Sequence, residues 1–325
     1  MKALVTGANG FVGYWVAKEL VNAGFEVRAL VRSEPTAHLK QLEMEIVQGD
    51  LCDGSSLAIA LKGCDYLFHV AAHYTLWERD PKLFYEVNVE GTKRLFSLAQ
   101  KQNIQKIVYT SSVAAIKLSL DGTPVDETSE ARLSDIVGHY KKSKFLAEQA
   151  VLEMAQHGLP VIIVNPSTPV GAYDIKPTPT GKIIVDFLKG KMPAYVDTGL
   201  NLVAVEDVAK GHLLAAEKGE FGKRYILGNK NLELIEIFRI LEKISGVKAP
   251  KIKMPYWIAY SAGAVSEIWA KLSDTAPAIP LDGVRMSRKR MFFESSRAKM
   301  INFQPGSVED ALERAVHWFQ ENGYV

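Results

Sequence analysis

Cysteine is scarce in this chain, with only two among 325 residues. Cys52 and Cys64 are too few for a disulfide framework, and their spacing matches no common metal-binding pattern. We therefore expect no disulfide scaffold and no metal site, so the fold must be stabilised by its apolar core.

Charge imbalance and long apolar runs are also absent. The 39 Lys and Arg residues against 37 Asp and Glu give a formal charge of +2, which does not favour a nucleic-acid partner. No stretch approaches the roughly 20 apolar residues of a transmembrane segment. The N-terminus lacks the apolar core of a signal peptide. These absences predict a cytoplasmic protein.

Strands and helices are predicted to alternate through the first half of the sequence. Strands are expected at 2–6, 26–31, 45–50, 66–72, 106–112 and 160–166, and helices at 11–23, 81–102 and 140–157. The strands are continuous runs of Val, Ile and Leu, as in sheets covered by helices on both faces. This pattern predicts an α/β fold built on a Rossmann-type doubly wound parallel sheet.

The character of the sequence changes after Gly171. We expect residues 1–171 to form a dinucleotide-binding domain, completed by elements that return from about 200 to 228. Residues 172–325 are expected to form mostly a smaller α/β substrate-binding region, with the substrate cleft between the two parts. The apolar helix predicted at 256–272 is expected to cover that cleft, or alternatively to dock a polycyclic or membrane-borne substrate.

The motif VTGANGFVG, residues 5–13, lies between the first strand and the first helix. Glycine permits a positive φ there and lets the backbone approach a pyrophosphate. The N-terminus of the next helix would offer unpaired N–H groups to the phosphates. The motif therefore predicts dinucleotide contacts from Gly7, Asn9, Gly10, Phe11, Val12 and Gly13.

Arg32, just past the second strand, indicates which dinucleotide is bound. A reader of the 2′-hydroxyl of NAD would be acidic and about 20 positions past the glycines. An arginine instead can pair with a 2′-phosphate. NADP(H) is therefore favoured, while NAD(H) stays possible because Glu34 is close by. Further cofactor contacts are expected at the ends of the third and fourth strands, from Asp50, Leu51, Ala71 and Ala72.

Tyr140 and Lys144 are four residues apart in a predicted helix and so share one face. A phenol with a pKa of about 10 exchanges protons poorly at neutral pH, and a nearby ammonium group favours the phenolate. Ser111 or Ser112, at the end of the fifth strand, could hold the same substrate oxygen. This set predicts proton transfer coupled to hydride transfer at a nicotinamide. Lys141 and Lys142 are expected on the solvated face.

Six ordered motifs make the chain resemble the extended short-chain dehydrogenase/reductases, in the NAD-dependent epimerase/dehydratase group. They are TGANGFVG (6–13), NVEGT (88–92), TSS (110–112), YKKSK (140–144), NPSTPVG (165–171) and NLVAVEDVAKGH (201–212). The resemblance implies that Tyr140 is the general acid/base and Lys144 its partner and a ribose ligand. It also implies that Ser112 holds the substrate and Asn88 orients the lysine side of the site, and that the nicotinamide contacts Pro166, Ser167 and Thr168.

Within this group the chain is similar to dihydroflavonol 4-reductase-like proteins and to hopanoid-associated sugar epimerases. Val113 and Ala114 follow Ser112, where family dehydratases carry Asp-Glu, and the Tyr-Gly typical of nucleotide-sugar 4-epimerases is missing. Together with Arg32, this favours NADP(H)-dependent reduction of a ketone or aldehyde to an alcohol. The alternative is a sugar epimerase that retains NAD⁺ through its cycle.

The remaining predictions concern the substrate and the quaternary structure. His69, within an apolar strand, is interpreted as a core histidine. The helices at 81–102 and 140–157 are long enough to form a homodimer interface, as in many relatives. Substrate contacts besides Ser112 are expected from His73, Tyr74, Trp77, Asn201 and Arg285.

Overall fold

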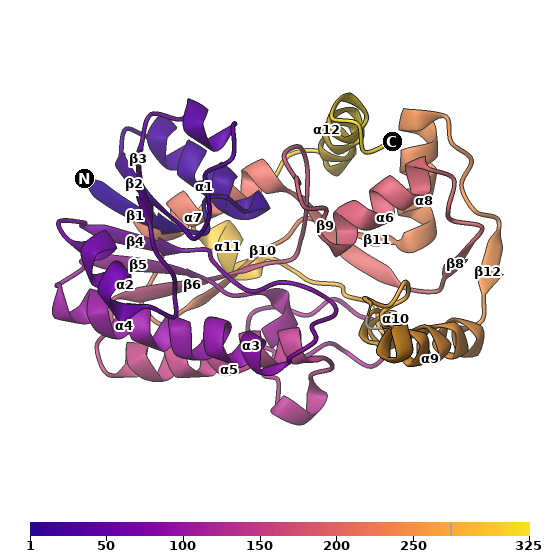
Figure 1. Ribbon diagram of the computed structural model, residues 1–325, viewed down its shortest axis with the longest axis horizontal. Helices are drawn as coiled ribbons and strands as arrows, with labels where there is room; N and C mark the ends of the chain where they lie inside the picture. Colours follow the sequence, from indigo (N-terminus) through magenta and orange to yellow (C-terminus); the bar gives the residue numbers. More distant parts are fainter. Residues whose placement is uncertain (274) are drawn as a thin grey trace.

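The computed structural model describes residues 1–273 and 275–325, and its main feature is a seven-stranded, all-parallel sheet (Figure 1). The strand order is β10-β6-β5-β4-β1-β2-β3. The predicted doubly wound parallel sheet is confirmed. The strands are β1 (Lys2–Thr6), β2 (Glu26–Val31), β3 (Glu45–Gln48), β4 (Tyr66–His69), β5 (Lys106–Thr110), β6 (Val161–Pro166) and β10 (Arg224–Leu227).

The strand order changes direction beside β1, which pairs with β2 on one side and with β4 on the other. Thr6, the last residue of β1, is in register with Leu30 of β2 and His69 of β4. The loops that follow β1 and β4 therefore leave the sheet at the same edge and diverge. In open α/β sheets this is the place where ligands bind.

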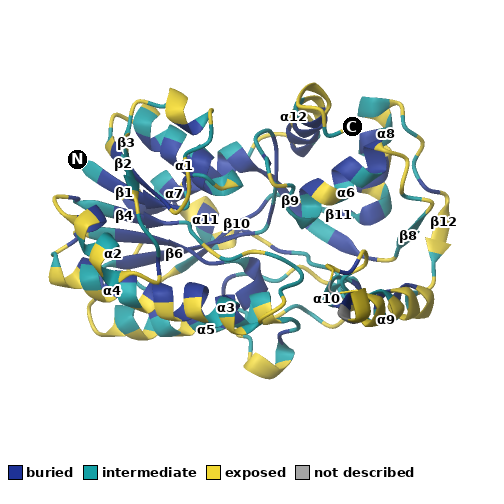
Figure 2. Cartoon of the chain, in the orientation of Figure 1, coloured by how far each residue is buried: buried dark blue, intermediate teal, exposed yellow. Residues whose placement is uncertain are grey.

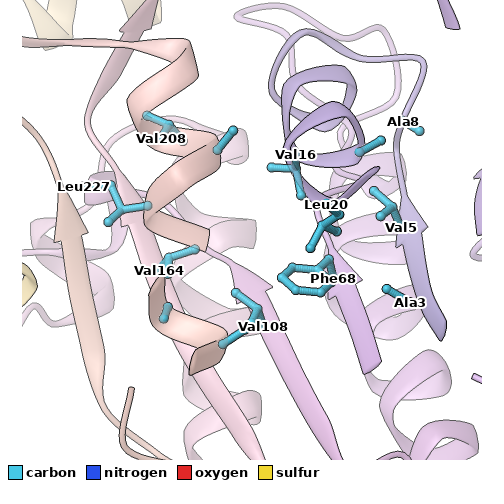
Figure 3. Packing of buried hydrophobic residues seen from close by; sticks show 14 of the residues in the cluster. Ala3, Val5, Ala8, Val16, Leu20, Phe68, Val108, Val164, Val208 and Leu227 are labelled. Carbon is cyan, nitrogen blue, oxygen red and sulfur yellow. The ribbon is translucent and has the colours of Figure 1, made fainter. Parts of the chain in front are cut away.

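Helices cover both faces of the sheet. One face carries α1 (Phe11–Asn22) and α7 (Val205–Lys218), and the other carries α2 (Gly54–Leu61), α4 (Gly91–Lys101) and α5 (His139–Gln156). Figure 3 shows Val16 and Leu20 of α1 directed toward Val5 and Phe68 of the sheet. Burial on both faces explains why these strands are continuously apolar.

The helix predicted at 81–102 is interrupted. It consists of α3 (Lys82–Tyr85), a π-helical turn η2 (Glu86–Glu90) and α4. Such π turns insert an extra residue into a helix and are frequent at functional sites. The turn contains Asn88, whose side chain is buried.

The third, fourth and fifth strands, β3, β4 and β5, are each shorter at their carboxyl end than predicted. The strands end at Gln48, His69 and Thr110 rather than at residues 50, 72 and 112. After β4 the N–H of Ala71 donates to the Thr6 hydroxyl, 3.2 Å away, instead of to a strand carbonyl. The apolar pattern thus continues into loops that border the sheet edge.

The remaining elements form a smaller region with its own core (Figures 1 and 2). A three-stranded sheet, β11-β9-β7, shares this core with α6, α8 and α12, and a separate pair, β12-β8, leads into α9 and α10. The bounds are β7 (Thr168–Val170), α6 (Pro179–Leu188), β8 (Ala194–Val196), β9 (Gly199–Ala204), β11 (Lys230–Glu233), α8 (Leu234–Ser245), β12 (Ile252–Met254), α9 (Tyr256–Ser273), α10 (Leu281–Met286), α11 (Ser296–Met300) and α12 (Val308–Glu321).

Of the elements expected to return to the main sheet, α7 and β10 do so, whereas β9 belongs to the smaller sheet. The described part of the chain contains no helix with the length and apolar character needed to cross a bilayer.

Replacing Phe68 with alanine should lower the free energy of unfolding by about 3–5 kcal/mol, because its fully buried ring fills the layer between β4 and α1. Denaturant titration followed by circular dichroism measures the change. Phe221, which is 54% exposed, is the matched control, and Phe221→Ala should cost less than about 0.5 kcal/mol. Equal losses in the two variants would contradict this account of the core.

Candidate active site

The glycine loop holds the first turn of α1 tightly against the ends of β1 and β4. Gly7 has a φ of 76°, and a Cβ there would lie 2.7 Å from the backbone of Ala71. A Cβ on Gly13 would lie 2.0 Å from the carbonyl oxygen of Gly7. Only glycine permits this close packing. Gly10 precedes α1 without a side-chain cap, which leaves the N–H groups of the first turn, beginning with Phe11 and Val12, available to an anion.

Asn9 connects this loop to the segment after β2. Its Oδ1 accepts from the N–H and the hydroxyl of Thr36, at 3.0 and 3.2 Å, and its Nδ2 donates to the carbonyl of Glu34 at 3.1 Å. Arg32 is exposed nearby, and its guanidinium has no acidic partner among the described residues. The Glu34 carboxylate is instead 2.7 Å from Lys40 Nζ. Of Arg32 and Glu34, only Arg32 is without an ion-pair partner among the described residues.

The ends of β3 and β4 bring four more predicted cofactor residues to this edge of the sheet. Asp50 accepts from the N–H of Cys52 through Oδ1 at 2.8 Å, and Leu51 is buried against Gly91. Ala71 is bonded to Thr6, whereas Ala72 is exposed. At the end of β6, after Pro166, the Ser167 hydroxyl is buried without a protein partner, and Thr168 opens β7. An orphaned buried hydroxyl indicates a missing ligand or water.

Ser112 and Tyr140 meet at the carboxyl end of β5. Ser112 precedes the 3₁₀ turn η3 (Val113–Ala115), and its Oγ accepts from the N–H of Ala114 at 3.1 Å. Burial raises the pKa of the Tyr140 phenol well above its ordinary value, and a hydrogen bond with the Ser112 side chain acts in the opposite direction. Ser111 is buried, and its hydroxyl has no hydrogen-bond partner among the described residues. Ser112 is therefore the hydroxyl beside the phenol.

Lys144 lies one turn along α5 from Tyr140, but its ammonium points to the backbone of β5. Nζ donates to the carbonyl oxygen of Thr110 at 2.7 Å and lies 4.8 Å from the ring centroid of Tyr109. Burial lowers the pKa of Lys144 to about 7, and the carboxylate of Glu148 acts in the opposite direction. Burial has the largest effect on the pKa of Tyr140, and the role of the Lys144 ammonium in favouring the phenolate stays a prediction.

Asn88 holds the start of α5 rather than Lys144 itself. Its Nδ2 donates to Ser143 Oγ at 2.9 Å and to the carbonyl of His73 at 3.1 Å, and its Oδ1 accepts from the N–H of His73 at 2.7 Å. Ser143 in turn donates to the carbonyl of Tyr140 at 2.7 Å. The π turn thus connects the loop after β4 to the turn of α5 that carries Tyr140.

Sequence reasoning missed a buried polar group beneath Ser112. Asn165 Nδ2 donates to the carbonyl of Ser112 at 3.0 Å and to Glu148 Oε2 at 2.7 Å. Glu148 Oε1 lies 3.4 Å from a guanidinium nitrogen of Arg224. Glu148 is fully buried, four residues after Lys144 on the same face of α5. That spacing was the available signal, because Tyr140, Lys144 and Glu148 form one polar stripe on the helix.

His69 is a satisfied core residue, as interpreted from the sequence. Its Nδ1 is 2.8 Å from Thr6 Oγ1 and its Nε2 is 2.9 Å from Thr92 Oγ1. Burial lowers its pKa to about 3, so the ring is neutral at physiological pH.

The loop after β4 places an aromatic ring against the candidate site. The ring centroid of Tyr74 lies 4.6 Å from that of Tyr140, while His73 Nε2 is 2.7 Å from Glu78 Oε2. Trp77 is half-buried in the same loop, where its backbone N–H donates to the Thr75 hydroxyl at 3.2 Å.

Lys141 is not on the solvated face of α5. Its Nζ lies 3.8 Å from Met291 Sδ, and burial together with the like charge of Lys289 lowers its pKa to about 8. The prediction failed because the segment around Met291, just before α11, lies against the first turn of α5. Lys142 is half-buried.

Asn201 and Arg285, both predicted to bind substrate, lie in different environments. Asn201 is buried in β9, where Oδ1 accepts from the N–H of Asn229 at 2.9 Å and Nδ2 donates to Asn231 Oδ1 at 2.7 Å. Its amide joins neighbouring strands, so Asn201 is a structural residue rather than the predicted substrate contact. Arg285 is exposed on α10 and pairs with Asp282 at 3.3 Å.

A model of the NAD dependent epimerase/dehydratase family matches residues 3–228, the stretch from β1 through β10. The chain belongs to this family. It is accordingly an NAD(P)-dependent enzyme of the short-chain dehydrogenase/reductase type.

Individual relatives match nearly the whole chain. A Synechocystis protein named "Putative dihydroflavonol 4-reductase" is 47% identical, over 99% of this chain and 95% of its own length. "Sterol demethylase protein B" of Methylococcus capsulatus is 30% identical over the full length of both. The crystal structure of gox2253 is 47% identical over 99% of both chains, with a TM-score of 0.89.

The residues at the sheet edge fit the nicotinamide dinucleotide that the family implies. The tightly packed Gly7–Gly13 turn, the uncapped start of α1 and the orphaned Ser167 hydroxyl lie where the phosphates and the nicotinamide half would need partners.

Lys144→Met should change how stability depends on pH. The pKa of Lys144 falls from 10.5 to about 7 on folding, so between these values the unfolded chain binds a proton that the folded protein does not. Stability therefore rises with pH across this window in the wild type, and this rise is lost as pH falls toward 7. Urea titrations of the cofactor-free protein from pH 7 to 10 should show the variant's stability advantage shrinking as pH rises. Parallel profiles would contradict the lowered pKa of Lys144.

Proposed function

We propose that the protein is an NADP(H)-dependent reductase that converts a ketone or an aldehyde into an alcohol. The observation that carries the proposal is the half-buried Tyr140 phenol beside the Ser112 side chain at the carboxyl end of β5. A phenol is protonated at neutral pH and, placed at a substrate oxygen, can donate the proton that a reduction requires. The names of relatives point the same way, since they include a dihydroflavonol 4-reductase and cinnamoyl-CoA reductases.

Residues around the glycine loop would hold the dinucleotide, which when bound supplies a hydride to the substrate carbonyl carbon. The first turn of α1 would bind the pyrophosphate, and the unpaired Arg32 the 2′-phosphate. Lys144 is proposed to contact the nicotinamide ribose, and Pro166, Ser167 and Thr168 to lie against the nicotinamide.

Ser112 would donate a hydrogen bond to the carbonyl oxygen of the substrate. Negative charge that develops on this oxygen would be neutralised by the proton from Tyr140 Oη, which leaves a phenolate that must be reprotonated before the next cycle. Asn88 and the Asn165–Glu148 pair would keep both hydroxyls in place, since they bond to α5 and to the Ser112 carbonyl. The loop with His73, Tyr74 and Trp77 would shape the substrate side.

Epimerisation is the second candidate function. The structure of PA4631 from Pseudomonas aeruginosa, titled a nucleoside-diphosphate-sugar epimerase, is 26% identical with a TM-score of 0.81. Epimerisation is disfavoured because the Tyr-Gly that nucleotide-sugar 4-epimerases typically carry just beyond the serine is missing from this chain. Elimination of water is disfavoured as well, because the residues after Ser112 are the buried and non-ionisable Val113 and Ala114.

Two further parts of the proposal concern organisation. Residues 1–171, with α7 and β10, would bind the cofactor, and most of 172–325 would serve the substrate. A homodimer through the helical segments at 81–102 and 140–157, which both lie on one face of the main sheet, is proposed as well.

Tyr140→Phe should lower kcat about 10²–10⁴-fold and leave the Kd of NADPH nearly unchanged, because only the proton donor is removed. The assay follows NADPH consumption with ketones and aldehydes, together with a dihydroflavonol and a cinnamoyl-CoA. Tyr66→Phe, at the opposite end of β4, is the matched control and should retain full activity. Retained activity in Tyr140→Phe would refute the proton-transfer role, and tightly retained NAD⁺ without NADPH consumption would favour an epimerase.

Arg32→Glu should weaken NADPH binding by about ten- to a hundredfold, the effect of losing a charge-assisted contact to the 2′-phosphate. NADH, which lacks that phosphate, should bind almost as before. Fluorescence titration of the cofactor-free protein measures both values. Lys62→Glu introduces the same charge change on an exposed residue and is the control. An equal loss for both dinucleotides would show that Arg32 does not read the 2′-phosphate.

A further inference from the structure

Helix α9 presents its large apolar side chains to solvent (Figure 2). Trp257 and Trp269 are each 69% exposed, and the residues between them that face outward are mostly aliphatic or small. The exposed large apolar residues of the helix are Trp257, Ile258, Tyr260, Val265, Ile268, Trp269 and Leu272. From the sequence we expect this helix to cover the substrate cleft. Its two tryptophans instead point to solvent.

The inner face of α9 consists of small residues and is tied to the protein. Ala259 and Ala270 are buried, and a Cβ on Gly263 would lie 3.2 Å from Leu281 and Val284 of α10. Glu267 Oε1 accepts from the N–H of Leu281 at 3.3 Å. At about 100° per residue, the large side chains other than that of Tyr260 occupy an arc of about 120° opposite this face. An ordinary surface helix is oriented the other way, with its apolar stripe inward.

The two tryptophans border a shallow groove of about 610 Å³ on the outer face. Its lining between them is Ser261, Ala262, Val265 and Ser266, with almost no polar surface. The tryptophans are 12 residues apart, or about 18 Å along the axis, so both reach the same depth only if the helix lies parallel to whatever it contacts. Tryptophan is the side chain most typical of the boundary between lipid and water.

Positive charge is concentrated around this helix. Residues 246–290 contain eight Lys and Arg against three Asp and Glu, a net charge of +5 in a chain whose total is +2. Lys248, Lys253 and Arg290 pair with acids outside this stretch. The Arg288 guanidinium lies 5.8 Å from the ring centroid of Tyr256, in the first turn of α9. Neither Arg288 nor Lys251 has an acidic partner among the described residues. An apolar helix face flanked by cations is complementary to an anionic lipid surface.

A second copy of the chain is a poorer match for this face. In a two-fold symmetric contact through α9, the cations around one helix would meet the same cations of the other. Negatively charged headgroups would instead neutralise them while the groove accepts acyl chains.

We propose that α9 is a peripheral docking element for an anionic lipid bilayer. The helix lies in the plane of the interface, with Trp257, Val265 and Trp269 inserted and the flanking lysines and arginines on the headgroup phosphates. The element borders the candidate site through α10, because Gly138, which precedes α5, lies against Asp282, and Leu76 lies against Gly283. Docking would thus bring the substrate side of the molecule close to the bilayer.

Vesicle flotation tests the proposal. The wild-type protein should float with vesicles of phosphatidylcholine and phosphatidylglycerol, and much less with phosphatidylcholine alone. The Trp257→Ser/Trp269→Ser variant should lose about tenfold in bound fraction, because binding follows inserted apolar area. Phe221→Ser removes another exposed aromatic, outside α9, and should float like the wild type. Cofactor affinity and the unfolding midpoint show whether each variant is folded.

Depth-dependent quenching provides a second readout that does not depend on the serine variants. Brominated phosphatidylcholine in the anionic vesicles should quench wild-type tryptophan fluorescence, and this quenching should largely disappear in Trp257→Phe/Trp269→Phe. The proposal is overturned if the wild type does not float, if the double serine variant floats as well as the wild type, or if quenching persists without these two tryptophans. It is equally overturned if the same variants abolish a dimer that forms without lipid.

Discussion

The close approach of α1 to the ends of β1 and β4 is the constraint on which the rest of the structure depends. There is no room for a side chain at Gly7 or Gly13, since the nearest backbone atoms lie 2.7 and 2.0 Å from where a Cβ would be. This contact aims the free N–H groups of α1 at the point where the strand order reverses. It also sets the position of Ala71, and hence where the loop with His73 and Tyr74 begins. This one contact thus positions both the cofactor side and the substrate side of the site.

The candidate catalytic groups are positioned mainly by bonds between buried side chains and backbone carbonyls. Lys144 bonds to the carbonyl of Thr110, Asn165 to that of Ser112, and Ser143 to that of Tyr140. Leaving any of these polar groups unpaired in the interior costs about 1–3 kcal/mol, so the arrangement is stable only when all form together. The edge of β5 and the first turns of α5 are consequently held as one rigid unit beneath the two hydroxyls.

The main sheet and α9 differ in whether their large apolar side chains are covered by protein. In the main sheet nearly every large apolar side chain is covered by a helix, as Phe68 is by α1. On α9 the small residues are inside and the large ones outside, and the flanking segments add positive charge. A helix of this kind is costly in water unless something covers it, and the charge around it distinguishes lipid from a second copy of the chain.

The sequence by itself determined the features that depend on neighbouring residues. Continuous Val, Ile and Leu runs indicate strands covered on both faces, the three glycines indicate a tight strand-to-helix turn, and four-residue spacing places Tyr140 and Lys144 on one helix face. Only the tertiary structure decided where the long or polar side chains point. Lys144 turns to β5, Lys141 is covered by the segment around Met291, and Asn201 is taken up by strands β9 and β11. The π turn at Asn88, the Asn165–Glu148 pair and the outward face of α9 likewise depend on which surfaces meet, and a local pattern carries no information about a partner that is distant in the chain.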